Sequence, residues 1–262
     1  MVKYSIYYIF IGGDFLEKLI TVMNFSHVYE YENFYINKKY KWIDCTNLKG
    51  TNGYCDNESM KILEKKVQAI NPKSIHFIDN GNYHYLSKLW LSKIKEKFIL
   101  LVFDHHCDMI KPAFSNNILS CGSWIMNCIE ENKYLIKVII VGLSNEQKNI
   151  IPNKYSSKVS CICDDELSSN IKLIKSIKNI DNLPIYISID KDVLNKKIVD
   201  LTWDQGVIDL ESLKYTLNYF IQSKNIIGID VCGESEVFKY DEIIKNNYIN
   251  LEILKLLNKY LT

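Results

Sequence analysis

The stretch FILLVFDHHCD, residues 98–108, contains the strongest indication of the fold. Its uninterrupted apolar run is typical of a strand that is buried on both faces of a sheet. Acidic and imidazole side chains follow directly, at the point where this strand is expected to end. In an open parallel sheet, ligands bind beyond the carboxyl ends of the strands. The stretch therefore predicts a parallel α/β sheet with a polar site at one edge.

Similar runs of β-branched or aromatic residues recur along the chain, and segments with helical spacing separate them. The predicted strands are 3–10, 75–79, 98–103, 137–141, 158–163, 185–190 and 226–231. The predicted helices are 58–70, 85–96, 170–179, 210–222 (with Asp209 as N-cap) and 241–261. Because strands alternate with helices, we expect βαβ units and a mainly parallel sheet with helices on both faces.

Internal repeats, charge blocks and breaks in composition are absent from the sequence, which predicts a single domain over residues 1–262. Segment 24–57 is the least regular part of the chain and is rich in Tyr and Asn. We expect it to form an irregular excursion on the surface.

Composition excludes several classes of function. Lys and Arg number 32 against 31 Asp and Glu, so no basic excess favours binding to nucleic acid. A run of about 18 uncharged apolar residues, which a membrane span would need, does not occur. The first residues resemble a strand more than a signal peptide, because Gly12-Gly13-Asp14 interrupts them and a small-residue cleavage site is lacking. The 8 cysteines of so large a chain are expected to be reduced, which favours a cytoplasmic protein.

Acidic and imidazole side chains follow three of the predicted strands. They lie in the stretches DNGNYH (79–84), DHHCD (104–108) and DKD (190–192). Alternate side chains of an extended segment share a face, so D-x-H-x-D and D-x-D should each project their polar groups together. The candidate ligands are His84, Asp104, His106, Asp108, Asp190 and Asp192.

So many carboxylates do not stay ionised side by side without a cation. One ion would have more ligands than it needs, whereas two divalent ions that share bridging carboxylates suit their number. Oxygen and imidazole donors without a convergent thiolate favour Mn²⁺ or Fe²⁺ over a structural zinc. Two such ions about 3.5–4 Å apart hold a bridging hydroxide near neutral pH and make it a nucleophile. The residues therefore predict two divalent ions per chain, with Mn²⁺ or Fe²⁺ favoured and Zn²⁺ as an alternative.

These motifs resemble those of the ureohydrolase superfamily, which includes arginase, agmatinase and formimidoylglutamase. The D-A-H-x-D motif is matched by residues 104–108, S-x-D-x-D by 188–192, and G-G-D-H, in degenerate form, by 81–84. The resemblance implies a three-layer α/β/α fold of the arginase/deacetylase type and a dinuclear manganese centre. It also implies hydrolysis of a C–N bond in a small guanidino, amidino or formimino compound, and it is compatible with a homo-oligomer.

The resemblance further implies a division of the ligands between the two metals. His84 and Asp108 would belong to one metal, His106 and Asp192 to the other, and the two would share Asp104 and Asp190.

Substrate contacts are predicted at four residues. Glu234 is a candidate partner for a cationic substrate group, because a planar guanidinium pairs well with a carboxylate. Trp203 and Asp204 are expected near the mouth of the site, and the resemblance implies that Ser123 is a further pocket residue.

Two departures from the family pattern predict that the chain is not a strict arginase. Cys121-Gly122 stands where arginases have a proton-relaying His-Gly pair, and Gly233 stands where they have a guanidinium-binding Glu. Two alternatives remain open. Asp104, His106 and Asp190 alone would suit the single zinc of a deacetylase-like amide hydrolase. The chain would otherwise be a metal-binding relative without catalytic activity.

Overall fold

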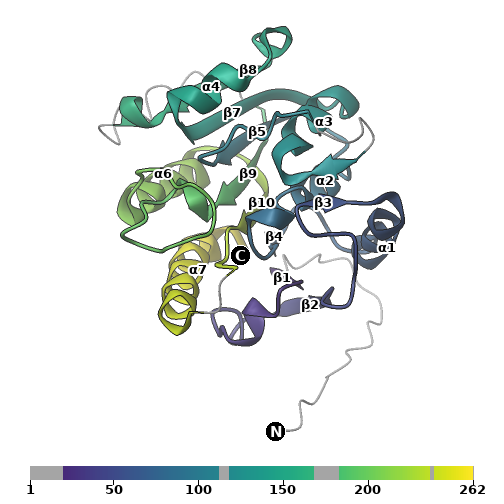
Figure 1. Ribbon diagram of the computed structural model, residues 1–262, viewed down its shortest axis with the longest axis vertical. Helices are drawn as coiled ribbons and strands as arrows, with labels where there is room; N and C mark the ends of the chain where they lie inside the picture. The colour runs from purple at the N-terminus through teal and green to yellow at the C-terminus, as the bar shows by residue number, and fades with distance from the viewer. Residues whose placement is uncertain (1–19, 112–117, 168–182, 237–238, 262) are drawn as a thin grey trace, which may run out of the picture.

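A parallel β-sheet forms the centre of the computed structural model, which describes residues 20–111, 118–167, 183–236 and 239–261. Its strands are β1 (Ile20–Asn24), β2 (Tyr40–Asp44), β4 (Ile75–Phe77), β5 (Phe98–Phe103), β7 (Leu135–Leu143), β8 (Val159–Cys163), β9 (Ile185–Asp190) and β10 (Ile226–Cys232). Among the described residues they form an 8-stranded sheet in the order β2-β1-β4-β10-β9-β5-β7-β8, and every neighbouring pair is parallel (Figure 1).

Helices cover both faces of this sheet. They are α1 (Asn57–Val67), α2 (Leu86–Leu91), α3 (Trp124–Glu131), α4 (Asn145–Ile150), α6 (Leu210–Ser223) and α7 (Tyr240–Leu261). In Figure 1, α6 and α7 lie on one side of the strands, and α1, α2 and α3 lie on the other. The short strands β3 (Tyr54–Cys55) and β6 (Leu119–Ser120) pair separately and antiparallel. The predicted three-layer α/β/α fold with a mainly parallel sheet is confirmed.

Two apolar cores explain why β5 carries no polar side chain. Alternate residues of the strand, beginning with Ile99, belong to the core that contains Leu217 of α6 and Leu254 of α7. The other residues, beginning with Phe98, belong to the core that contains Trp90 of α2. Successive side chains of a strand point to opposite faces, so a strand covered on both sides needs an apolar residue at every position.

Strands β5 and β9 have the bounds that the sequence predicts, and Asp209 caps α6 as expected, since its side chain accepts a hydrogen bond from Ser212 N at 2.7 Å. The strand predicted over 3–10 and the helix predicted over 170–179 lie outside the described residues. The single domain over 1–262 stays a prediction.

The irregular excursion predicted for residues 24–57 is wrong for part of that segment. Strand β2 lies inside it and pairs in parallel with β1, from Ile20 opposite Tyr40 to Asn24 opposite Asp44. Because β2 is the last strand in the sheet order, most of its side chains are exposed or half-buried. This edge strand therefore lacks the apolar run by which a buried strand is recognised in a sequence.

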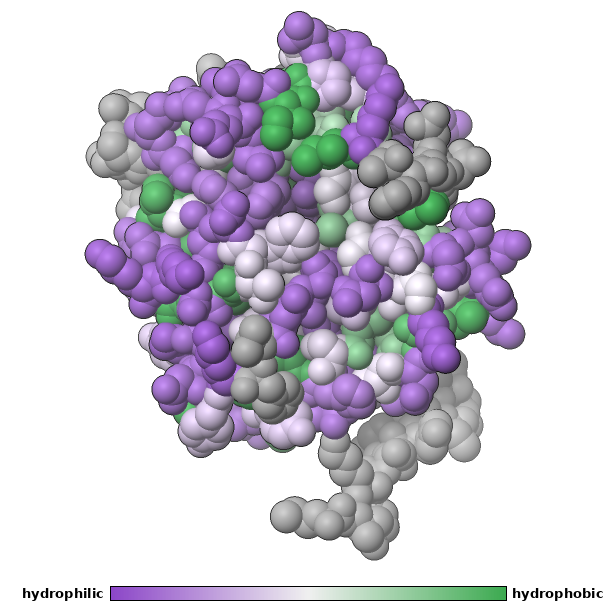
Figure 2. All heavy atoms as spheres, in the orientation of Figure 1, coloured by the Kyte–Doolittle hydropathy of each residue, from purple (hydrophilic) through white to green (hydrophobic). Residues whose placement is uncertain are grey.

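Hydrophilic residues predominate on the face seen in Figure 2, and hydrophobic residues form small, separate patches there. In the described ranges, the structure contains no helix that is both long and apolar enough to cross a bilayer. All 8 cysteines lie in these ranges, and each is a free thiol.

Candidate metal centre

The carboxyl ends of adjacent strands bring the candidate ligands together. Strand β9 lies between β5 and β10, and Phe103 of β5 is paired with Ile189 of β9. The next residues of the two strands, Asp104 and Asp190, therefore stand side by side. His84 reaches the same edge from the C-cap of the 3-10 turn η2 (Gly81–Tyr83), which follows β4.

One nitrogen of His84 faces three carboxylates. Its Nδ1 lies 3.1 Å from Asp104 Oδ2, 3.2 Å from Asp108 Oδ2 and 3.5 Å from Asp190 Oδ2. All four side chains are buried. Within the described residues, neither His84 Nδ1 nor Asp104 Oδ2 has a hydrogen-bond partner. Because buried polar atoms are rarely left without a partner, these two atoms indicate a place for a cation.

A second cluster surrounds His106. Its Nδ1 lies 2.8 Å from Asp192 Oδ2 and 3.7 Å from Asp104 Oδ1. Asp104 thus directs one carboxylate oxygen toward each histidine. The candidate ligand atoms of His84, Asp104 and Asp108 lie within 4.8 Å of one another. The same holds for those of Asp104, His106 and Asp192. This is the arrangement expected of a carboxylate that bridges two metal positions.

The ligands converge by a local geometry that differs from the extended segments assumed from the sequence. Asp108 has a left-handed backbone with φ of 48°, and His106 N donates to Asp104 Oδ1 at 2.6 Å. Asp190 and Asp192 flank the start of the 3-10 turn η6 (Lys191–Val193), where Asp192 N donates to Asp190 Oδ1 at 3.0 Å. Tight turns, rather than alternation along a strand, therefore aim these side chains at one point.

Outer hydrogen bonds hold the ligands in place. His84 Nε2 lies 2.9 Å from Ser188 Oγ, which donates to Asp230 Oδ1 at 2.5 Å. Trp124 Nε1 donates to Asp108 Oδ2, also at 2.5 Å. Partners of this kind fix the ring orientation of a metal-binding histidine. These hydrogen bonds, from His84 Nε2 to Ser188 and from Ser188 to Asp230, direct His84 Nδ1 toward the carboxylates.

Like charges perturb the titration of the cluster. Burial, reinforced by the charge of Asp104, raises the pKa of Asp108 to about 6. Burial and then the charges of Asp190 and Asp104 raise the pKa of Asp192 well above its usual value. Burial opposes the charged form of His106, but its close contacts with the carboxylates of Asp104 and Asp192 raise its pKa to about 12. A cation beside each group of carboxylates would offset these like charges.

The candidate ligands line a cavity of about 90 Å³. In the described part of the chain, its walls are His84, Asp104, His106, Asp108, Asp190 and Asp192 together with Gly81, Ile110, Cys121, Gly122 and Trp203. The ring of Trp203 lies 5.7 Å from that of His106, centroid to centroid, and is 42% exposed. A cavity of this size has room for about three water molecules.

Only one of the four predicted substrate contacts borders this cavity. Trp203 does so, as expected near the mouth. Ser123 is fully buried, and its hydroxyl lies 2.9 Å from Ser120 Oγ and 3.0 Å from Ser120 N. Asp204 is exposed and is not part of the cavity wall.

Glu234, predicted to receive a cationic substrate group, has an internal partner instead. It is 2% exposed, does not border the cavity, and accepts a hydrogen bond from the ammonium of Lys191. The preceding Gly233 has φ of 90°, and a Cβ there would lie 2.5 Å from Asp190 Oδ1. A carboxylate side chain is therefore excluded at position 233 and is paired internally at position 234.

Sequence reasoning missed one side chain at the centre, the thiol of Cys232. Cys232 is the last residue of β10 and is paired with Asp190 of β9 in the sheet register. A single cysteine in an apolar run carries no signal of its own, and only the pairing of β10 with β9 places it here.

Solved structures share this fold at low sequence identity. A formimidoylglutamase from Bacillus subtilis superposes with a TM-score of 0.70 at 13% identity, covering 96% of this chain and 89% of that one. A proclavaminate amidino hydrolase from Streptomyces clavuligerus gives 0.69 at 12% identity, covering 94% and 92%. An arginase from Bacillus subtilis gives 0.68 at 14% identity, covering 92% and 98%.

Sequence comparison adds one curated relative and a family. A protein of Thermotoga maritima, described as an uncharacterized protein, is 33% identical over 194 residues, which are 73% of this chain and 72% of that protein. The model of the arginase family matches residues 16–236, a range that includes every candidate ligand. This match and the shared fold lead to one conclusion: the chain belongs to the arginase family.

Proposed function

We propose that this chain is a dinuclear metal-dependent hydrolase that cleaves a C–N bond of a small guanidino, amidino or formimino compound. Membership of the arginase family indicates a hydrolase-type enzyme. The observation that carries the proposal is the position of Asp104, whose Oδ2 lies 3.1 Å from His84 Nδ1 and whose Oδ1 lies 3.7 Å from His106 Nδ1. A carboxylate with one oxygen in each cluster is suited to bridging two cations.

Each cation would have its own histidine and aspartate. The proposed sets are His84 with Asp108 and His106 with Asp192, and both share Asp104 and Asp190. Oxygen and imidazole donors suit Mn²⁺, with Fe²⁺ or Zn²⁺ as alternatives. When bound, a pair of divalent cations balances the four carboxylates in formal charge and lowers the pKa of a water that they share.

The protein side chains would orient the substrate and exclude water. The cavity admits only a small head group beside the ligands, and Trp203 offers a ring at its mouth. A planar cationic group is attracted to the face of such a ring. Cys121 and Gly122 border the cavity without an imidazole. The residues therefore support an amidine-type hydrolase other than a strict arginase.

Metal content and activity test the proposal together. Protein purified with Mn²⁺ is expected to contain close to two ions per chain by elemental analysis. A panel of guanidino, amidino and formimino compounds should then yield urea, ammonia or formamide from at least one member. Asp192→Asn should abolish this release and leave the circular dichroism spectrum unchanged, because it removes a ligand at nearly constant volume.

Other outcomes would point to other functions. One zinc per chain with deacetylation of an acetylated amine would favour a deacetylase-like amide hydrolase. Two ions without release from any compound would favour a metal-binding relative without catalytic activity. The small-molecule substrate, the cytoplasmic location and a homo-oligomer are predictions that go with the proposal.

A further inference from the structure

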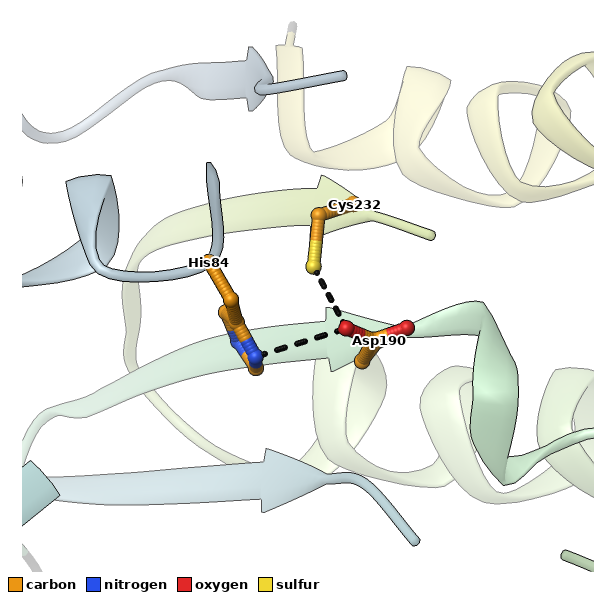
Figure 3. Close-up of side chains that lie close together, drawn as sticks. All are labelled: His84, Asp190 and Cys232. Carbon is orange, nitrogen blue, oxygen red and sulfur yellow. Dashed lines mark hydrogen bonds and ion pairs between the residues drawn. The ribbon is translucent and has the colours of Figure 1, made fainter. Parts of the chain in front are cut away.

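The thiol of Cys232 lies among the candidate ligands. Cys232 ends β10, and Asp190 ends β9, its partner in the parallel register. Figure 3 shows the sulfur of Cys232 and the imidazole of His84 approaching the carboxylate of Asp190 from two sides. The Sγ atom donates to Asp190 Oδ2 at 3.0 Å, and the residue is fully buried.

The imidazole provides an independent indication of a ligand at this point. His84 Nδ1 lies 3.5 Å from the same Asp190 Oδ2, and His84 is 1% exposed. Among the described residues, that nitrogen has no hydrogen-bond partner. The nitrogen, the oxygen and the sulfur all lie within 4.8 Å of one another. Three donor types, each from a different chain segment, thus face a common centre.

Other cysteines lack this combination. Cys121 borders the cavity but belongs to no group of candidate donors in the described ranges. Cys163 is grouped with Asp165 and Glu166, whose side chains are exposed to solvent. Within the described part of the chain, Cys232 is the cysteine whose thiol is grouped with a buried carboxylate and a buried imidazole.

We propose that Cys232 supplies a thiolate ligand to the cation held by His84, so that the two metal positions of this chain differ. The position at His84 would have sulfur, nitrogen and oxygen donors, whereas the one at His106 would have nitrogen and oxygen only. Binding would release the thiol proton to solvent and replace the hydrogen bond to Asp190. The inference rests on the proposed dinuclear function, to which it adds a ligand and a metal preference.

Donor softness sets that preference. Thiolate ligands favour Zn²⁺, Co²⁺ or Fe²⁺ over Mn²⁺, whereas carboxylates accommodate Mn²⁺ well. The position at His84 should therefore select the softer ion from a mixture, and the position at His106 should accept Mn²⁺. A chain of this kind would hold a mixed pair of metals when both are supplied.

Cobalt titration tests the inference directly. Metal-free protein is titrated with Co²⁺ while bound metal is measured by equilibrium dialysis and absorbance is recorded in the near ultraviolet. A thiolate-to-cobalt charge-transfer band should develop with one of two bound equivalents. Cys232→Ser should lose this band and still bind two equivalents. Cys121→Ser, which changes the thiol that borders the cavity, should keep it.

Each result has a separate meaning. Two bound cobalt ions without the band, or a band that survives in Cys232→Ser, would overturn the role of Cys232 and leave the dinuclear proposal standing. Failure to bind cobalt at all would overturn both. X-ray absorption of the zinc-loaded wild-type protein gives a check that needs no variant, since a sulfur neighbour at about 2.3 Å from zinc is expected.

A competition experiment measures the preference. In wild-type protein one position should favour Zn²⁺ over Mn²⁺ more strongly than in Cys232→Ser. Cys232→Ser should lower the ratio of Zn²⁺ affinity to Mn²⁺ affinity at that position by at least about 10- to 100-fold. This is the factor by which the loss of a residue that only supports a ligand lowers metal affinity. An unchanged ratio would contradict the inference.

Discussion

Replacing Glu234 with glutamine removes one carboxyl group from a buried polar network between β9, β10 and α7. In this network the ammonium of Lys191 donates to Glu234 Oε1 and, at 2.7 Å, to Asn246 Oδ1. Asn250 Nδ2 lies 2.8 Å from both Glu234 Oε1 and Glu32 Oε2. All five side chains are buried. The network contains two carboxyl groups and one ammonium, so one proton keeps it neutral.

Its environment makes Glu32 the side chain on which protonation is favoured. Burial, and next the charge of Glu234, raises the pKa of Glu32 well above its usual value. In Glu234→Gln this repulsion is lost, and Glu32 becomes available as the anion for Lys191. The variant should therefore lower the free energy of unfolding by only about 1–3 kcal/mol, the range for a disturbed buried hydrogen bond. Glu32→Gln keeps a neutral group and should have an effect below about 1 kcal/mol.

The double variant should be worse than the sum of the two. Without Glu32 and Glu234, the ammonium of Lys191 has no anion inside the network, a loss of about 3–5 kcal/mol for breaking a buried pair. Urea unfolding of the metal-free proteins at pH 7 measures the three values and their coupling, expected at about 1–3 kcal/mol. Glu130→Gln, at an exposed ion pair with Lys154, is the matched control and should have little effect.

Additive effects would refute this account of the network. So would a Glu234→Gln variant that unfolds like wild type but has a raised KM for a cationic substrate. That second result would return Glu234 to the substrate-binding role that its place in the sequence suggests.

Further outcomes follow from the same contacts. The pKa of Glu32 is raised in the folded state, so its contribution to stability is complete below the unfolded pKa of about 4.3. This contribution is lost as the pH rises toward the folded pKa. Glu32→Gln should therefore flatten the dependence of stability on pH, measured by urea unfolding at a series of pH values. Ser188→Ala should weaken Mn²⁺ binding by about 10- to 100-fold in calorimetry, because it removes the partner of His84 Nε2; unchanged affinity would contradict the outer-ligand role. Mn²⁺ at a free concentration 100 times its Kd should stabilise the wild-type protein by about 2.7 kcal/mol per site against urea, and Asp192→Asn should lose part of this gain. Mn²⁺ affinity should fall as the pH is lowered. The pKa of His106 is raised to about 12 without metal, and its proton must leave before the imidazole can bind the ion. Calorimetry in buffers of different ionisation enthalpy would count the protons released.

Local patterns of residues were sufficient to predict the strands that form the centre of the sheet. Strands β5 and β9 are covered on both faces, so they need continuous apolar runs, and such runs are visible without any knowledge of their neighbours. The cap at Asp209 is equally local, because its side chain bonds a backbone amide three residues away. The spacing within 104–108 and 190–192 likewise predicted a convergence of polar side chains, although turns rather than extended segments produce it.

Contacts between distant segments settled the rest. Strand β2 is recognisable only by its pairing with β1, because most of its own side chains are exposed or half-buried. Glu234 carries no sequence signal of burial, yet the packing of α7 against the sheet encloses it with Lys191, 43 residues earlier in the chain. Cys232 meets Asp190 through the register of two parallel strands, 42 residues apart. The period of an apolar pattern reports which face of a segment is covered, whereas the partner of a buried charge or thiol depends on which segments fold against each other.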